Sequence, residues 1–424
     1  MSPKSPKPEI ATKPQRVTSV DALRGFIMFM MIFVNDLSGA GRILPDWMVH
    51  FSDRHDQGES GMTFVDLVFP AFLFIVGMSI PLALGARRAR REPAWKSLGH
   101  IALRTISLLC IGILMVHETP NSAALGWSGA WWCVLMYASA IAAFCWISPP
   151  ASIPKPKWHA WQIANRAVRL IGIATLVWLA FAFRGLNGDR IIGLSPFHLS
   201  TQWYGILGLI AWAYLVTCLV FLLCDGNRTA ILGGMALLFC LFATDKKGAF
   251  EGFWLSRIVG IGDMLGSLPA IALGGLLLGS MLTATELGDL KTCKRFTFWF
   301  VAACAAAALL LNPVYGISKN RATPSWCLWS CGITASLWYG FHLICDVRPM
   351  TIISRPLASA GQNVLLAYLL SEMLPGLLEA LALGNWYGHL AASVPLAIIR
   401  SAVCGLLLLL ASTSLNRIGF RLKL

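Results

Sequence analysis

About twelve apolar stretches, each near the length of a membrane-crossing helix, follow one another along this chain. A helix needs about 20 apolar residues to cross the hydrocarbon core of a bilayer. Of the 424 residues, 57% are hydrophobic and only 13% are charged, whereas about 25% are charged in an average soluble domain. This composition excludes a soluble enzyme, a disordered scaffold and a nucleic-acid-binding module. The stretches lie at residues 24–44, 62–85, 98–117, 129–148, 167–184, 202–224, 229–244, 264–284, 296–312, 325–345, 358–378 and 391–413.

The basic residues predict how these stretches cross the membrane. Lys and Arg number 34 against 20 Asp and Glu, and loops rich in Lys and Arg face the cytoplasm. With the N-terminus inside, about 24 of the 34 basic residues fall on the cytoplasmic side, and an even number of spans preserves this alternation. We therefore expect an all-α polytopic transmembrane helix bundle of about 10–12 spans, with both termini cytoplasmic. The lack of a long soluble insert favours a bacterial cytoplasmic (inner) membrane.

The chain does not divide into separate soluble domains. Residues 1–17 form a polar tail without the apolar core of a signal peptide, and we expect a disordered cytoplasmic segment there. Residues 18–424 then form one transmembrane domain. Most of the twelve cysteines lie within apolar stretches, where Cys behaves as a small hydrophobe. Cys327 and Cys331 are four residues apart, but no histidine or second cysteine pair stands at ligand spacing, and we expect no metal.

Ionisable side chains inside apolar stretches are costly and often functional. The first candidates are Asp21 and Arg24, where the tail enters the first stretch. Three residues apart on a helix, they are placed to pair on one face. The alternative is an ordinary helix start anchored at the membrane surface.

A second polar cluster lies between the first two stretches. Asn35 stands near the end of the first stretch, and His50 and His55 lie in the loop that follows. Thr63 and Asp66 fit a capping box, which predicts a helix start near Thr63. A neutral imidazole beside an acid is what a general base near pH 7 requires. For either histidine the alternative is an exposed loop residue.

A third group comes late in the chain. Gln362, Asn363 and Glu372 interrupt an apolar stretch, so they should face the bundle interior, where they either bond between helices or line a cavity. Lys319 lies in a short polar segment before the tenth stretch, and His342 within that stretch favours a packed core position.

Several catalytic patterns are absent from the sequence. It contains no phosphate-binding P-loop, no G-x-S-x-G nucleophile elbow and no H-E-x-x-H pair. These absences argue against an ATP-driven pump, a serine hydrolase and a zinc protease.

Several motifs in order resemble the heparan-α-glucosaminide N-acetyltransferase family, whose members are transmembrane acyltransferases. The resemblance extends over about residues 17–372, and its first block is the most specific. The motifs are Ser19-Val20-Asp21-x-x-Arg24-Gly25, Phe33-Val34-Asn35, Gly61-x-Thr63-x-x-Asp66-Leu67-Val68-Phe69-Pro70-x-Phe72-x-Phe74-Ile75-x-Gly77, Gly262-x-x-Leu265-Gly266-Ser267-Leu268-Pro269 and Gly361-x-Asn363-x-x-Leu366-x-Tyr368.

This resemblance implies which residues carry the chemistry. An Asn at the end of the first matching helix and a His in the next loop are the family's catalytic pair, and Asn35 matches the Asn without a gap. His55 lies six residues before Gly61 and His50 lies eleven before it, just after Trp47. We favour His55 as the base and keep His50 as the second candidate.

The resemblance also implies acetyl-CoA as the acyl-donor cosubstrate, bound from the cytoplasmic side, with no metal. Because CoA carries several phosphates, basic residues near the cytoplasmic end of the bundle are the expected contacts. The candidate donor-binding residues are Arg24, Asp21, Arg87, Arg88 and Asn363.

The interpretation is thus an integral-membrane acyltransferase. It would move an acetyl or similar acyl group from acyl-CoA to an amino sugar or glycan hydroxyl on the far side. The expected partners are acyl-CoA, the sugar acceptor and membrane lipid, without nucleic acid, and a homodimer is one option for its assembly. The alternatives are a multi-span solute transporter, a lipid-linked sugar flippase, or a non-catalytic scaffold.

Overall fold

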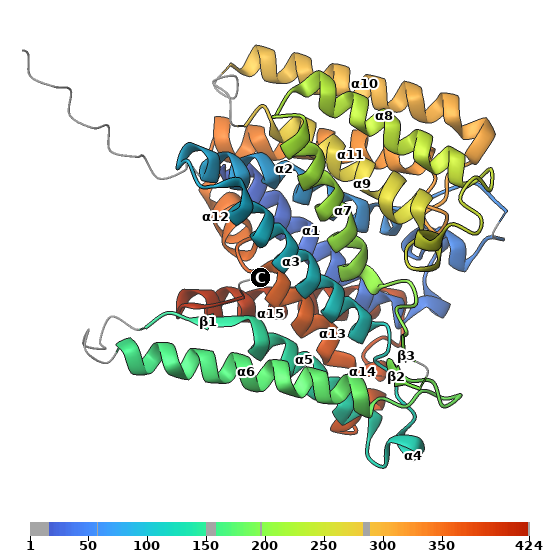
Figure 1. The fold of residues 1–424 in the computed structure, drawn as a ribbon, viewed down its shortest axis with the longest axis vertical. Coiled ribbons are helices and arrows are strands. Elements are labelled where there is room, and N and C mark those ends of the chain that lie inside the picture. The colour runs from blue at the N-terminus through green and yellow to red at the C-terminus, as the bar shows by residue number, and fades with distance from the viewer. Residues whose placement is uncertain (1–16, 57, 150–157, 196, 283–288, 423–424) are drawn as a thin grey trace, which may run out of the picture.

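The computed structural model describes residues 17–56, 58–149, 158–195, 197–282 and 289–422, so all but the last residue of the predicted 1–17 tail lies outside the described residues. The described chain is mostly helical, which confirms the all-α bundle (Figure 1). The α-helices are α1 (Thr18–Ser38), α2 (Val68–Ala89), α3 (Ala94–Met115), α4 (Ser122–Leu125), α5 (Gly129–Phe144), α6 (Trp158–Ala182), α7 (Gly205–Leu223), α8 (Arg228–Asp245), α9 (Leu268–Gly279), α10 (Leu290–Tyr315), α11 (Pro324–His342), α12 (Thr351–Ala360), α13 (Val364–Ala380), α14 (Gly384–His389) and α15 (Val394–Arg417).

Short elements join these helices. Two antiparallel pairs of strands are formed, β1 (Cys145–Ile147) with β4 (Phe420–Leu422) and β2 (Ile192–Leu194) with β3 (Phe197–Leu199). Single π-helical turns precede α9 and follow α11, at Asp263–Ser267 and Leu343–Val347. Short 3₁₀ turns lie at Gly41–Ile43, Asp46–Met48, Phe51–Asp53, Val65–Leu67 and Trp254–Arg257.

The predicted apolar stretches coincide with helices, but fewer of them qualify as spans than the expected 10–12. In the described part of the chain, seven helices are long and apolar enough to cross a membrane, or up to eight if the bent pair α12–α13 counts as one span. The apolar helices Gly129–Phe144 and Asp263–Gly279 are shorter than a full span. The remaining predicted stretches fall on α1 and α11.

Helix α1 occupies the middle of the bundle and contacts α12, α15, α2, α11 and α13 (Figure 1). Its wide burial follows from its sequence, because apolar residues occupy most of its circumference. Close approach to α12 depends on Gly25 and Gly361. A Cβ atom at either position would collide with the backbone of the other segment. The first half of α1 is therefore fixed against the α12–α13 junction.

The predicted stretch at 358–378 is not one helix. It breaks between Ala360 and Val364, and α12 and α13 meet at 71°. The side chain of Asn363 explains part of the break, because its Nδ2 donates to the Phe420 carbonyl (3.2 Å) and its Oδ1 accepts from Leu422 N (3.3 Å). Strand β4 is thereby held across the junction.

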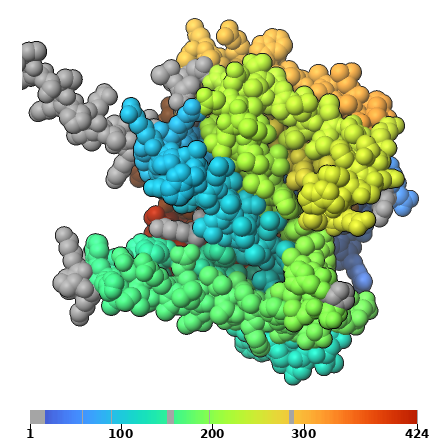
Figure 2. All heavy atoms as spheres, in the orientation of Figure 1, coloured from blue at the N-terminus to red at the C-terminus, as the bar shows by residue number. Residues whose placement is uncertain are grey.

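Helices α5 and α6 form a separate edge of the molecule. They pack on each other and reach the bundle mainly through α13. A space-filling view shows a hollow between this edge and α3 (Figure 2). The outer face of α6 is apolar, with Leu170 65% and Ile171 66% exposed. Such a face suits contact with lipid.

Candidate functional site

A cavity of about 670 Å³ lies among α1, α2, α3, α7 and α13, with further lining from α5, α6 and β4. On α1 the lining residues Arg24, Met28 and Met31 recur once per helical turn, so they lie on one face of the helix. Phe72, Val76 and Ser79 line the facing side of α2 in the same way, so each helix contributes a continuous stripe.

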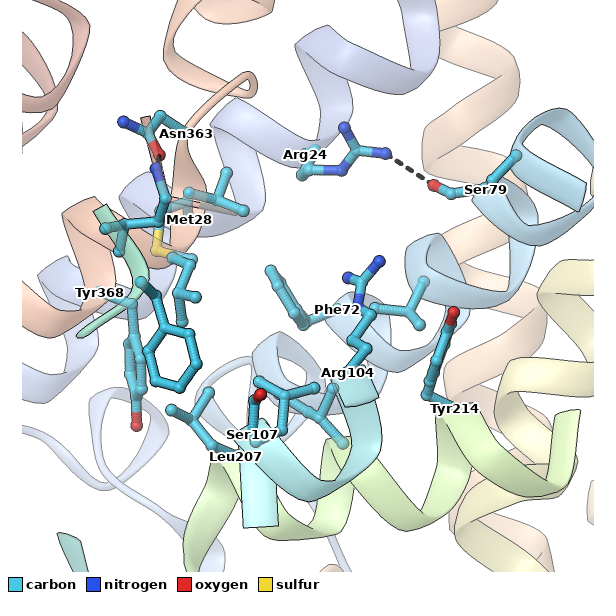
Figure 3. A pocket seen from close by; sticks show the side chains of 18 of the residues that line it. Arg24, Met28, Phe72, Ser79, Arg104, Ser107, Leu207, Tyr214, Asn363 and Tyr368 are labelled. Atoms are coloured by element: carbon cyan, nitrogen blue, oxygen red, sulfur yellow. Dashed lines mark hydrogen bonds between the residues drawn. The ribbon is translucent and has the colours of Figure 1, made fainter. Parts of the chain in front are cut away.

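The cavity is basic at one end. Four arginines and one histidine line it, and none of its described lining residues is acidic. Arg24 and Arg104 face the same space in the close-up view (Figure 3). The cations are Arg24, Arg87, His100, Arg104 and Arg169.

Two of these arginines are balanced by neighbouring carboxylates and two are not. Arg24 Nη1 lies 2.9 Å from Asp21 Oδ1, and Arg87 Nη1 lies 3.6 Å from Glu92 Oε2. Within the described residues, Arg104 and Arg169 pair with no carboxylate. The Arg104 guanidinium instead lies over the Tyr214 ring, 4.7 Å from its centroid. Uncompensated charge inside membrane-spanning helices is costly, so these two arginines favour an anionic ligand.

The predicted pairing of Asp21 with Arg24 is therefore present, and it points the guanidinium into the cavity. Arg24 also donates to Ser79 Oγ on α2 (2.6 Å) and to the Gly361 carbonyl (3.4 Å). These contacts place one cation where α1, α2 and the α12–α13 junction meet.

The opposite end of the cavity is lined by uncharged side chains. Met28, Met31, Phe72 and Tyr368 line this end. On α1 the next position on the cavity-facing stripe after Met31 is Asn35, about 16 Å along the helix from Arg24. Asn35 Nδ2 donates to Glu372 Oε1 (2.9 Å), and Glu372 lies one turn beyond Tyr368 on α13. The stripes on α1 and α13 thus meet at an amide–carboxylate pair.

A second polar pair lies close to Glu372. Tyr137 on α5 donates to Glu118 Oε2 (2.8 Å), and the charges of Glu118 and Glu372 interact. Burial raises the pKa of Glu118, while its bond from Tyr137 acts in the opposite direction. Sequence reasoning did not single out this pair.

The loop between α1 and α2 places its two histidines differently. His50 Nδ1 lies 2.7 Å from Asp66 Oδ1, and the Asp66 side chain is only 2% exposed. The second oxygen of Asp66 accepts from the backbone N–H groups of Phe51 (3.1 Å) and Thr63 (3.0 Å). Asp66 therefore fixes both the His50 ring and the start of α2. The regular helix starts at Val68 after a 3₁₀ turn, a few residues later than the capping-box pattern predicts.

Lys319 completes the surroundings of His50. Its Nζ lies 3.2 Å from both ring nitrogens of His50. Burial lowers the pKa of Lys319, and the negative charges of Asp66 and Asp53 oppose that effect. The sequence drew attention to Lys319 as a polar residue before the tenth stretch, but it gave no sign of contact with His50.

His55 stands apart from this group. Its Nδ1 contacts Glu59 Oε2 (2.8 Å), and its ring stacks on Phe51 with the ring centroids 4.0 Å apart. The Glu59 side chain is 53% exposed, so this pair is open to solvent. The sequence-based preference for His55 therefore falls on the histidine whose carboxylate partner is more exposed.

The other predicted residues also have defined places. Arg87 and Asn363 line the cavity, although the amide of Asn363 is bonded to β4. Arg88 does not line the cavity; it is exposed and pairs with Asp225. The cavity arginines that the prediction omitted, Arg104 and Arg169, had a sequence signal, since each is a cation within or beside an apolar stretch. No group of three or more His, Cys, Asp or Glu able to hold a metal occurs among the residues described.

The described helices define a multi-span membrane protein with a basic cavity between them. The chain belongs to the family described as a domain of unknown function (DUF5009), whose model matches residues 16–250, more than half of the chain. This family membership gives no activity by itself.

Two curated relatives carry a functional name. The chain is 36% identical over 118 residues to the heparan-alpha-glucosaminide N-acetyltransferase of Homo sapiens, and 36% identical over 112 residues to that of Mus musculus. These matches cover 28% and 26% of this chain but only 16% of each relative. They confirm the resemblance that the sequence motifs predict, over a shorter segment than 17–372.

Proposed function

We propose that this protein is an integral-membrane acyltransferase that moves an acetyl or similar acyl group from acyl-CoA to an amino sugar or glycan hydroxyl. The observation that carries the proposal is the cavity, with cations at one end and uncharged side chains at the other, on the same face of α1 as Asn35. The partial similarity to a membrane N-acetyltransferase supports the same reaction class. We further propose the inner membrane of a bacterium as its location.

The cavity fits the chemistry of the donor. CoA joins a phosphate-rich nucleotide to a long uncharged arm that ends in the thioester. Arginine is suited to phosphate because its guanidinium donates several hydrogen bonds in one plane. Arg24, Arg87, Arg104 and Arg169 would hold the phosphates, while Met28, Met31 and Phe72 would contact the uncharged arm.

The reaction itself needs a base and a group that stabilises negative charge. The base takes a proton from the acceptor as its nitrogen or oxygen attacks the thioester carbon, and the carbon–sulfur bond then breaks to release CoA. We propose His50 as the base because Asp66 accepts from its Nδ1, which leaves Nε2 as the proton acceptor. One N–H of Asn35 is bound by Glu372, and its second N–H is free to donate to the developing oxyanion.

Helix register supports bringing these groups together. Arg24 on α1 contacts Ser79 on the antiparallel helix α2. Moving 11 residues forward on α1 and 11 back on α2 brings Asn35 to the level of Val68, two residues from Asp66. His50 and Asn35 are thus proposed to act at the same depth, at the end of the bundle remote from Arg24.

Donor binding provides the direct test. Acetyl-CoA binding to the purified protein would be measured by calorimetry, together with Arg104→Ala, Arg169→Ala and the control Arg88→Ala. A bond to a charged group contributes about 1.5–3 kcal/mol, so each cavity variant should weaken binding roughly 10- to 100-fold. Arg88→Ala should change affinity less than twofold, because Arg88 lies outside the cavity.

Dephospho-CoA serves as the ligand control, and weaker binding of this analogue is expected. Failure of the folded wild-type protein to bind acetyl-CoA would overturn the proposal. Equal losses in Arg88→Ala and the cavity variants would instead show that the cavity is not the binding site.

A further inference from the structure

The segment between α10 and α11 is anchored to the loop between α1 and α2. Gly61 N donates to the Ile317 carbonyl (2.9 Å), and Ile317 N donates to Ser60 Oγ (2.8 Å). Gly316 allows the turn, since its φ of +66° is in the region that favours glycine. These bonds join segments more than 250 residues apart in sequence. They place Lys319 beside His50.

Lys319 lies over the face of the His50 ring. Its Nζ is 3.2 Å from Nδ1 and 3.2 Å from Nε2. A nitrogen equidistant from both ring nitrogens cannot lie in the plane of the ring, because there it would collide with the carbon between them. Lys319 therefore does not occupy the lone pair of Nε2, which lies in the ring plane. An ammonium above the ring opposes protonation of the imidazole by like-charge repulsion.

Asp66 acts in the opposite sense. Its carboxylate, 2.7 Å from Nδ1, favours the charged imidazolium. The charge of Asp53 also acts on Lys319, and Arg321 follows Lys319 two residues later on the same segment. A general base must be unprotonated before the reaction, so Asp66 alone would orient the ring but also favour its protonated form.

We propose that Lys319 is a positioning residue for acyl transfer, whose ammonium over the His50 ring balances the charge of Asp66 and disfavours the imidazolium form. This inference rests on the proposed role of His50 as the base. It assigns to Lys319 a role exerted through His50, without contact with the substrate.

The test compares Lys319→Met with Lys319→Arg, which retains the charge, and with Arg321→Met, which removes a nearby exposed charge. Diethyl pyrocarbonate modifies only unprotonated imidazole, so its reaction with His50, followed by mass spectrometry across pH, measures the unprotonated fraction without any acyl transfer. The His50 side chain is 30% exposed and accessible to a small reagent. His55 serves as an internal control on the same loop.

In Lys319→Met, the midpoint of His50 modification should rise by about one pH unit, which is tenfold in the unprotonated fraction below the midpoint. Acyl transfer should fall about tenfold at acidic pH and recover to within twofold near pH 9. Lys319→Arg and Arg321→Met should keep the wild-type midpoint. A midpoint in Lys319→Met that is unchanged, or that moves to lower pH, would overturn the proposal.

Two further readouts separate the causes of failure. Because burial lowers the pKa of Lys319 below that of the unfolded chain, protonation disfavours the folded state as the pH falls below the unfolded value, and Lys319→Met should unfold no earlier than wild type at pH 7. A shifted His50 midpoint in a protein that transfers no acyl group would refute the proposed function and not the charge balance. Full transfer activity in His50→Ala would refute the role of His50, and with it the positioning role of Lys319.

Discussion

Two histidines of one loop differ in the carboxylate that each contacts. His50 has a buried partner, Asp66, which is itself held by two backbone N–H groups. His55 has Glu59, whose side chain is more than half exposed. A base needs a fixed tautomer and a fixed direction, and a carboxylate that is already anchored provides both. The geometry therefore favours His50 for the role that the sequence assigned first to His55.

Replacing each histidine separately distinguishes them. His50→Ala should reduce acetyl transfer at least 100-fold, which is the usual contribution of a general base, without weakening acetyl-CoA binding. His55→Ala should retain transfer within about threefold, since only an exposed ion pair and one ring contact are lost. Transfer of labelled acetyl from acetyl-CoA to a panel of amino sugars would measure both. Greater loss in His55→Ala would instead identify His55 as the base.

Only some of the charged residues at the cavity could be predicted from the sequence. The pairing of Asp21 with Arg24 was predictable because helix geometry brings residues three apart onto one face. Arg104 and Arg169 were not selected, because a basic residue near the end of an apolar stretch has an ordinary explanation in membrane topology. Arg104 and Arg169 lie in the same cavity as Arg24 only because α1, α3 and α6 come together in the folded protein. No local sequence pattern predicts this packing.

Among the elements, α2 and α9 form an unusually close pair. A Cβ atom at Gly77 would collide with the Ala272 backbone, and one at Gly275 would collide with the Phe74 backbone. Small residues permit this approach, which van der Waals packing then stabilises within a membrane. The contact matters for the site because the opposite side of α2 carries Phe72, Val76 and Ser79 into the cavity.

A glycine exchange on α2 tests this packing. Gly77→Ala should destabilise the protein by about 1–3 kcal/mol, because the obstacle is backbone that cannot rotate away. Gly85→Ala on the same helix is the matched control, since no heavy atom lies within 4 Å of the added Cβ. It should be neutral or slightly stabilising, as alanine favours the helix. Thermal unfolding in detergent would compare them, and equal midpoints would contradict the close-packing argument.

The helices themselves were largely predictable, while their interruptions were not. Each apolar stretch gave a helix because length and apolarity are local properties of the chain. The stretch at 358–378 bends instead, because Gly361 packs against α1 and the Asn363 amide bonds to β4 some 57 residues later. Both causes are tertiary contacts. Likewise, the stretch at 129–148 ends early, as Cys145–Ile147 turns into β1 to pair with β4.

At the scale of the whole molecule, the proposed reaction requires the two ends of the bundle to face different compartments. The cavity arginines would meet CoA in the cytoplasm, while His50 and Asn35 would meet the sugar outside. The antiparallel register of α1 and α2 separates these groups, since Arg24 contacts Ser79 while Asn35 lies at the level of Val68. The excess of basic residues on the side of the N-terminus favours the same orientation.

This orientation predicts which engineered cysteines a membrane-impermeant maleimide reaches in intact cells. Ser52→Cys lies in the exposed loop that carries His50, and it should be labelled without permeabilisation. Lys96→Cys lies at the exposed start of α3, near the basic end of the cavity, and it should be labelled only after the membrane is opened. The unmodified chain controls for its own cysteines, of which Cys110 and Cys240 are exposed on the surfaces of α3 and α8. Labelling of Lys96→Cys in intact cells would place the basic end of the cavity outside, where cytoplasmic CoA cannot reach it, and would thereby exclude the proposed direction of transfer.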